Sequence, residues 1–184
     1  IGKSTLVRHF AAMAAESDGA LLLTGRCHER ESVPFKGVDS LIDALGKALS
    51  RLQARGLPPP VVEDLPPLLR LFPVLGRTLE VRRDATPTEA VANATWRRRA
   101  FRALRELLCK LALRQPLMIT LDDLQWADYD SAELLEVLFT PPAPVPMLLI
   151  AAHRNEERTR SPFLNHLHER LPHTSLVLGP LGPA

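Results

Sequence analysis

Two stretches of this chain decide its fold: IGKSTL at residues 1–6 and PLMITLDDLQWAD at residues 116–128. The first matches the second half of the pattern G-x-x-x-x-G-K-[ST] and continues into a helical stretch. In this pattern Gly2 lets the backbone approach a phosphate oxygen, Lys3 reaches the terminal phosphates, and Ser4 can offer its hydroxyl to Mg²⁺. These matching residues are weak evidence alone, but the second stretch strengthens them.

The second stretch is typical of a buried parallel strand that ends in two adjacent carboxylates. Residues 117–121 are apolar with a β-branched centre, and Asp122 and Asp123 follow directly. Ligands of open α/β sheets bind at the carboxyl ends of the strands. The sequence therefore predicts that Asp122 holds Mg²⁺, directly or through water, and that Asp123 orients or deprotonates an attacking water.

Composition restricts the classes of protein to consider. The chain has 184 residues, and its 46% hydrophobic content suits one globular domain with its own core. The net charge of +2 is too small to indicate nucleic-acid binding by itself. Cys27 and Cys109 are the only cysteines, which excludes a disulfide framework and suits a reducing compartment. No apolar run approaches the ~20 residues that span a bilayer, so we expect a cytoplasmic protein without a membrane partner.

Hydrophobic periodicity predicts helices and strands in alternation, which indicates a parallel sheet with helices on its faces. About ninety residues separate the first two visible strands, so residues 26–115 are expected to form a helical insertion. Asp130 and Glu133 have the spacing of a capping box at a helix start. The expected helices cover 4–16, 38–55, 96–114, 131–139 and 163–171, and the expected strands cover 20–24, 117–121, 147–152 and 174–178.

The outer side of the predicted 96–114 helix is basic and allows two interpretations. It could be a surface for nucleic acid or for a partner protein. We favour a solvated helix face, because long cationic side chains cover apolar neighbours and stabilise helices. The basic residues are Arg97, Arg98, Arg99, Arg102, Arg105, Lys110 and Arg114.

Further polar residues lie beside the two aspartates or follow the next strand. Arg154 follows the third expected strand, where a cation can meet a γ-phosphate. Trp126 and Asp128 are expected to fix the loop and the entry of the next helix rather than to contact substrate. His166 and His168 could ligate a metal, but the sequence offers no third ligand nearby, so we do not favour a metal site there.

Together these motifs resemble the AAA-like P-loop ATPase domains of the origin-recognition or signal-transduction (STAND) type. Such domains occur inside large bacterial regulators, joined to a serine/threonine protein kinase, an adenylate cyclase or a LuxR-type DNA-binding domain. DDLQWAD after an apolar strand is the most specific feature. The stretches that carry the resemblance are GKSTL at 2–6, GRCHERESVPF at 25–35, RRRAFRALRELL at 97–108, DDLQWAD at 122–128, AAHRNEE at 151–157 and SPFL at 161–164.

The resemblance implies an α/β fold, a P-loop NTPase three-layer sandwich with a parallel sheet. The phosphate-loop strand and the first half of its loop would precede residue 1, so residues 1–184 would be one fragment of an AAA-like ATPase domain, without lid or effector domains. By the same resemblance, Gly2, Lys3, Ser4 and Thr5 correspond to the end of Walker A, Asp122 and Asp123 to Walker B, and Arg154 to a sensor arginine. Asp123 and Arg154 are then the catalytic candidates, with Ser4 and Asp122 at Mg²⁺.

Three functions agree with these motifs. The first is a regulatory switch in which ATP holds a closed state and slow hydrolysis resets it. Its partners would be ATP, ADP, covalently linked effector or sensor domains and a nucleotide-dependent oligomer, with no nucleic acid bound through these residues. The second is a DNA-associated ATPase like the origin-recognition proteins, supported by the basic helix alone. The third is a scaffold that binds nucleotide without hydrolysis. The intact Lys3, Ser4, Asp122 and Asp123 argue against it.

Residues 1–184 alone are expected to be inactive, because half of the phosphate cradle lies outside them.

Overall fold

The computed structural model describes residues 2–29, 34–79, 93–140 and 147–179. The strands are β1 (Leu21–Arg26), β2 (Leu117–Asp122) and β3 (Met147–Ala151). The α-helices are α1 (Lys3–Ser17), α2 (Asp39–Ala54), α3 (Leu65–Leu71), α4 (Asn93–Ala112), α5 (Tyr129–Phe139) and α6 (Pro162–Arg170). Short 3₁₀ helices are η1 (Pro73–Arg77), η2 (Leu124–Trp126) and η3 (Asn155–Glu157).

The three strands form one parallel sheet in the order β1-β2-β3. In its register Arg26 at the end of β1 lies opposite Asp122 at the end of β2. Leu121 lies opposite Ala151 at the end of β3. The carboxyl ends of all three strands therefore meet at one edge of the sheet, where ligands of such sheets bind. β2 is central in the described sheet, which explains why its apolar run is buried.

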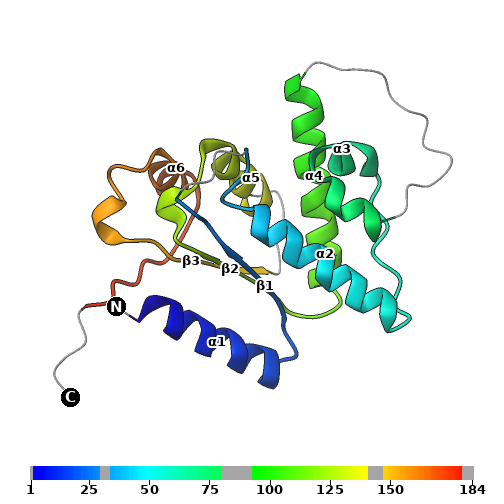
Figure 1. Ribbon diagram of the computed structural model, residues 1–184, viewed down its shortest axis with the longest axis horizontal. Helices are drawn as coiled ribbons and strands as arrows, with labels where there is room; N and C mark the ends of the chain where they lie inside the picture. The colour runs from blue at the N-terminus through cyan, green and yellow to red at the C-terminus, as the bar shows by residue number, and fades with distance from the viewer. Residues whose placement is uncertain (1, 30–33, 80–92, 141–146, 180–184) are drawn as a thin grey trace.

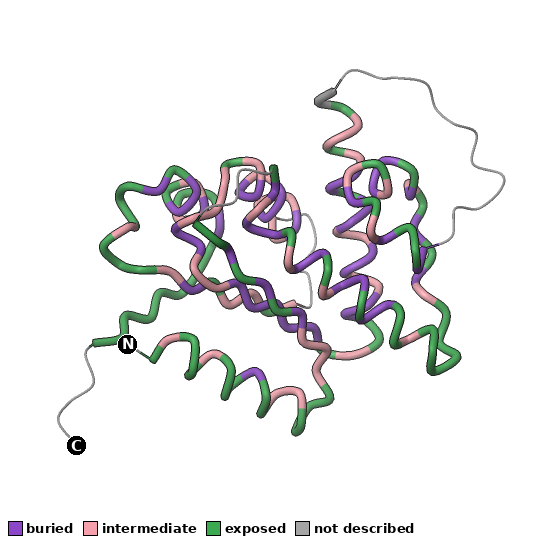
Figure 2. Tube along the Cα trace, viewed as in Figure 1, coloured by how far each residue is buried: buried purple, intermediate pink, exposed green. Residues whose placement is uncertain are grey.

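Helices cover both sides of the sheet, as the predicted α/β fold requires. Figure 1 shows α1 on one side of the sheet and the other helices on the opposite side. Buried residues lie between the sheet and this second group of helices and also among these helices, whereas α1 is largely exposed (Figure 2). The hydrophobic core is therefore concentrated on the side of the sheet away from α1.

The described residues between β1 and β2 form α2, α3, η1 and α4, in the stretch where the sequence predicts a helical insertion. The apolar stripes of α2 and α4 are buried because helical periodicity places them on one face. Phe35 links this layer, since its ring meets the rings of Phe72 and Phe101 edge-on, with centroids 5.7 and 5.8 Å apart. The buried stripe residues are Leu41, Ile42, Leu45 and Leu49 in α2, and Phe101, Leu104, Leu108 and Leu111 in α4.

Helix α5 begins after Asp128, whose side chain caps it. One carboxylate oxygen accepts from the backbone N–H of Ser131 at 2.6 Å, and the other accepts from the backbone N–H of Lys36 at 2.7 Å. The cap therefore also ties the segment before α2 to the start of α5. This agrees with the expectation that Asp128 fixes the helix entry.

The predicted capping box of Asp130 and Glu133 is wrong. Both side chains instead bond the Nη2 atom of Arg97 on α4, at 2.8 and 3.3 Å. The helix starts two residues earlier than the pattern indicated, because Asp128 satisfies the free N–H groups of the first turn. The spacing of Asp130 and Glu133 serves a contact between helices.

The last expected strand, residues 174–178, is also wrong. This segment has no regular secondary structure and joins none of the described strands. Its apolar residues Leu176 and Val177 are 78% and 74% exposed, so they do not contribute to the core. A short apolar run predicts a strand only where a neighbouring strand can pair with it.

No helix in the described part of the chain is both long enough and apolar enough to cross a membrane.

Candidate functional site

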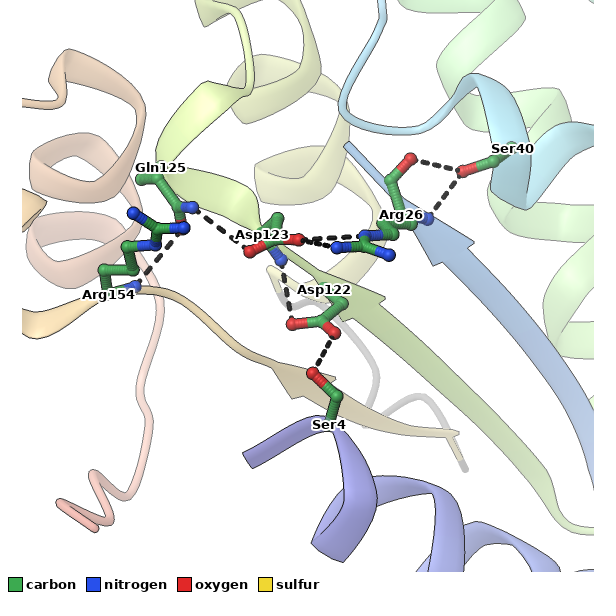
Figure 3. Close-up of polar contacts among 7 residues, drawn as sticks. All are labelled: Ser4, Arg26, Ser40, Asp122, Asp123, Gln125 and Arg154. Carbon is green, nitrogen blue, oxygen red and sulfur yellow. Dashed lines mark hydrogen bonds and ion pairs between the residues drawn. The ribbon is translucent and has the colours of Figure 1, made fainter. Parts of the chain in front are cut away.

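Four segments meet at the carboxyl edge of the sheet (Figure 3). The N-terminus of α1 lies beneath Asp122 at the end of β2. Arg26 ends β1 on one side, and Arg154 follows β3 on the other. The side chain of Asp123 occupies the centre of this arrangement. Residues that are far apart in the sequence are thus brought to one place by the parallel sheet.

The first turn of α1 carries the predicted phosphate-binding residues. Gly2 precedes the helix with φ of 100°, a left-handed conformation that residues with a Cβ rarely adopt. Lys3, Ser4 and Thr5 follow in the first helical turn, where free backbone N–H groups favour anions. The Ser4 hydroxyl donates a hydrogen bond of 2.5 Å to Oδ2 of Asp122. This contact joins the two predicted motifs directly.

The two aspartates point in different directions because the backbone turns sharply between them. Asp123 has φ of 57° and ψ of 36°, in the left-handed region that Asp tolerates better than most residues. Its backbone N–H donates to Oδ1 of Asp122 at 2.9 Å, which stabilises the turn. Asp122 therefore faces Ser4, and Asp123 faces the ends of β1 and β3.

Arg26 binds Asp123 through its guanidinium group. Its Nε and Nη2 atoms lie 2.9 and 2.8 Å from Oδ2 of Asp123. The backbone of Arg26 is held by Ser40, whose hydroxyl accepts from its N–H at 2.8 Å and donates to its carbonyl at 3.1 Å. Gly25 permits this approach of α2, because a Cβ there would lie 2.7 Å from Cδ2 of Leu121 and 2.9 Å from Oγ of Ser40.

Gln125 connects Asp123 to the segment after β3. Its Nε2 donates to Oδ1 of Asp123 at 3.2 Å, and its Oε1 accepts from the backbone N–H of Arg154 at 3.2 Å. The side chain is buried, with 7% exposure. Asp123 thus has a different partner on each oxygen, Gln125 on Oδ1 and Arg26 on Oδ2 (Figure 3).

The surroundings of Asp123 favour its charged form. Partial burial raises the pKa of this carboxyl, but the hydrogen bonds from Gln125 and Arg26 and the charges of Arg26 and Arg154 lower it by more. The pKa of Asp123 therefore lies below that of an ordinary aspartate. The carboxylate can accept hydrogen bonds at neutral pH.

The oxygen atoms of Ser4 and Asp122 fit Mg²⁺. Hydroxyl and carboxylate oxygens are the ligands that this hard cation prefers, and Mg²⁺ usually takes one or two protein ligands together with water and phosphate oxygens. The 2.5 Å contact shows that α1 and β2 bring these two donors to one point. The described residues hold no group of three or more His, Cys, Asp or Glu side chains arranged to bind a metal.

Sequence reasoning identified four of the residues that meet at this edge: Ser4, Asp122, Asp123 and Arg154. Lys3 and Thr5 lie beside Ser4 on α1, and within the described residues no hydrogen bond or ion pair joins them to the aspartates. Arg26, Ser40 and Gln125 were missed as contact residues. The end of the first strand was a usable signal for Arg26, since parallel strands in register bring their ends together.

The basic side of α4 is used largely for contacts within the molecule. Arg99 forms two hydrogen bonds with Asp64 of 2.6 and 2.7 Å, and Arg97 binds two acidic residues of α5. Lys110 pairs with Glu106. Two other basic residues of the helix, Arg98 and Arg102, are exposed to solvent.

The histidines near α6 have partners other than a metal. Nε2 of His166 lies 2.6 Å from Oε2 of Glu136 on α5. Nδ1 of His168 lies 2.7 Å from Nε2 of His173.

Comparison with known proteins gives one match. The family model described as "AAA ATPase domain" matches residues 1–150, which include both motifs and most of the chain. No curated protein matches the chain. No solved structure matches it.

Proposed function

Because this chain belongs to the AAA ATPase domain family, we propose that it binds ATP with Mg²⁺ and hydrolyses the nucleotide slowly as a regulatory switch. The setting we propose is a bacterial multidomain protein of signalling or transcription. In this function ATP holds one state of the domain and hydrolysis resets it. Linked effector or sensor domains, or a nucleotide-dependent oligomer, would respond to the difference between the two states.

The observation that carries the proposal is the hydrogen bond between Ser4 and Asp122. It joins a helix N-terminus, which favours phosphate, to a carboxylate at the end of a central strand. Phosphoryl transfer depends mainly on positioning and on electrostatic stabilisation of the phosphates. The oxygen atoms of Ser4 and Asp122 could ligate a metal ion, and the N-terminus of α1 beside them favours phosphate.

Each site residue has a proposed role. Lys3 binds the β- and γ-phosphates, and Gly2 and Thr5 shape the phosphate-binding turn. Ser4 and Asp122 hold Mg²⁺, which when bound neutralises charge on the phosphate oxygens. Arg154, at the end of the neighbouring strand, contacts the γ-phosphate.

Asp123 orients the attacking water. Among the described residues its Oδ1 accepts one hydrogen bond, from Gln125, whereas Oδ2 accepts both Arg26 contacts. A carboxylate has about four acceptor positions, so Oδ1 retains capacity for a water molecule. Because Asp123 is ionised and fixed on both sides, it can hold that water in one orientation.

The test separates the two aspartates in a version of the chain that carries the complete phosphate-loop motif. Asp122→Asn is expected to weaken Mg²⁺-dependent ATP binding about tenfold or more, because an amide is a poorer ligand for a hard cation. Asp123→Asn is expected to leave ATP bound while slowing hydrolysis by roughly 10²–10⁴-fold. Calorimetry and single-turnover phosphate release measure the two effects.

Two results would contradict the assignment. If Asp123→Asn lost binding and Asp122→Asn lost turnover alone, the two roles would be reversed. If neither substitution changed turnover, the protein would be a nucleotide-binding scaffold. Salt-dependent binding of duplex DNA would support the DNA-associated alternative, for which the internal contacts of α4 provide little support.

A further inference from the structure

Gln125 is a buried polar residue whose amide uses both of its ends. A buried amide costs free energy unless its donor and acceptor are both paired. Here the donor pairs with a carboxylate at the end of β2, and the acceptor pairs with a backbone amide after β3. A hydrocarbon side chain would fill the same space without needing hydrogen-bond partners. The amide therefore contributes its two hydrogen bonds in addition to packing.

The contacts of Gln125 extend an existing connection between the two segments. The backbone N–H of Leu124 donates to the carbonyl of Ala152 at 3.1 Å, and the N–H of Ala152 donates to the carbonyl of Leu121 at 2.8 Å. The segments after β2 and β3 are thus fixed to each other through their main chains. The side chain of Gln125 adds a contact between the Arg154 backbone and the side chain of Asp123.

Gln125 and Arg26 hold Asp123 in different ways. The Arg26 side chain is 65% exposed, so its ion pair is open to water and to salt. Gln125 is 7% exposed and uncharged, so its hydrogen bonds are shielded from both. Gln125 therefore holds Oδ1 of Asp123 by a contact shielded from salt, whereas Arg26 holds Oδ2 by contacts that salt weakens.

The geometry points to Gln125 as a positioning residue that fixes the carboxylate of Asp123 and couples it to the backbone of Arg154. The part of this inference that concerns turnover rests on the proposed ATPase function. A displacement of Arg154, for example on contact with a γ-phosphate, reaches Asp123 through the side chain of Gln125. The carboxylate that orients water would in this way respond to the presence of the terminal phosphate.

The two hydrogen bonds of Gln125, to Asp123 and to the Arg154 N–H, together form the bridge that two substitutions test separately. Gln125→Met keeps the length of the side chain but removes both hydrogen bonds. Gln125→Glu in its ionised form keeps an acceptor for the Arg154 N–H but cannot donate to Asp123, so it is compared at a pH at which the new carboxyl is ionised. Gln53→Met is a control for the chemical change, because Gln53, an exposed residue far from the site in sequence, also donates a side-chain hydrogen bond, to the carbonyl of Thr78 at 2.8 Å.

The first measurement needs no nucleotide. Amide hydrogen exchange at Arg154, followed by NMR on the chain of residues 1–184, is expected to accelerate about three- to tenfold in Gln125→Met, which corresponds to loss of one ordinary hydrogen bond. Gln125→Glu and Gln53→Met are expected to keep the exchange rate of the parent chain. Unchanged exchange in Gln125→Met would show that the bridge does not exist in solution.

The second measurement is turnover, with the complete phosphate-loop motif present. Both Gln125 variants are expected to lower kcat about tenfold while the KM for ATP changes less than twofold, because the bond to Asp123 is lost in both. Gln53→Met is expected to change neither constant. A purely structural role would instead lower kcat in Gln125→Met and leave it unchanged in Gln125→Glu, in step with the amide exchange.

The two proposals fail separately. If the parent protein does not hydrolyse ATP, the proposed function is wrong, and the exchange measurement still decides whether the bridge exists. If the parent protein hydrolyses ATP and both Gln125 variants keep the parent kcat, the ATPase stands and the positioning role is wrong. Thermal unfolding of each variant shows whether a loss of turnover follows from loss of the fold, and Gln125→Glu provides the test if Gln125→Met does not fold.

Discussion

At the scale of single residues, the main result is that two adjacent aspartates have separate surroundings. Asp122 accepts from Ser4, whereas Asp123 accepts from Arg26 and Gln125. The left-handed backbone at Asp123 produces the separation, since it turns the second carboxylate away from the first. One short motif can therefore supply a metal ligand and a water-orienting group.

Removing Arg26 is expected to raise the pKa of Asp123. In Arg26→Ala the carboxyl loses two hydrogen bonds and a neighbouring positive charge, while Gln125 and Arg154 remain. A lowered pKa stabilises the fold above the ordinary carboxyl pKa, and this stabilisation is lost as pH falls through the folded-state pKa. Arg26→Ala is therefore expected to lose less stability on acidification below pH ~4. Carbon-detected NMR titration of Asp123 without Mg²⁺ measures the pKa directly.

Arg98→Ala is the control for this titration, because Arg98 is an exposed arginine of α4. It is expected to leave the Asp123 titration as in the parent chain. An equal pKa in the parent and in Arg26→Ala would show that the ion pair does not persist in solution.

Arg154→Ala is expected to weaken ATP binding more than ADP binding. Arg154 follows β3, next to the strand that carries the aspartates, and its charge already acts on Asp123. A cation at this position would contact the γ-phosphate, which ADP lacks. Titration of both nucleotides into the chain with the complete motif measures the preference. An equal loss for the two would place Arg154 at the β-phosphate or in a structural role.

At the scale of elements, the start of α5 shows that the capping residue, Asp128, also makes a tertiary contact. Asp128 and Asp130 are both acidic residues near the helix start, but Asp128 alone of the two bonds the backbone of the first turn. Asp128 also accepts from Lys36, so this cap holds two segments together. Asp130 binds Arg97 with partly exposed side chains on both residues.

Asp128→Ala is therefore expected to destabilise the fold by about 1–2 kcal/mol, the usual cost of losing an N-cap. Asp130→Ala is expected to cost less than about 1 kcal/mol, since partly exposed ion pairs contribute little. Chemical unfolding of the two variants gives the comparison. If Asp130→Ala lowered the free energy of unfolding more than Asp128→Ala, the capping box predicted from the sequence would be supported instead.

At the scale of the whole molecule, the site is assembled from both sides of the sheet. α1 brings the phosphate-binding turn from one side, and the helices of the opposite side hold Arg26 and the segment after β2. α1 buries Ala11 but leaves Leu6, Phe10 and Met13 between 45% and 54% exposed. Its placement beside β2 consequently depends on few core contacts.

The complete phosphate-loop motif is expected to be required for ATP binding. Gly2, Lys3 and Ser4 supply the second half of the cradle, and the pattern needs backbone N–H groups from its first half as well. Calorimetry is expected to show ATP–Mg²⁺ binding by the chain with the complete motif and not by residues 1–184 alone. In the complete chain, Lys3→Ala is expected to remove most of the affinity, since charge-assisted contacts contribute roughly 1.5–3 kcal/mol each. Micromolar binding by residues 1–184 would show that half of the cradle is sufficient.

The sequence by itself determined the class of fold, the order of most elements and the position of the aspartates. These follow from local signals: apolar runs predict buried strands, helical periodicity predicts the stripes of α2 and α4, and Gly2-Lys3-Ser4 marks a helix start that favours phosphate. Each signal lies within a few consecutive residues, so it can be recognised without knowing which distant residues those residues contact.

The tertiary structure alone decided which polar groups meet. The pairing of Asp123 with Arg26 spans 97 residues of sequence, and the contact of Ser4 with Asp122 spans 118. Such contacts depend on strand order and register, which periodicity does not encode. The same reason explains the two wrong expectations: Asp130 caps no helix because Asp128 also has Lys36 to bind, and residues 174–178 form no strand because no described strand lies beside them to pair with.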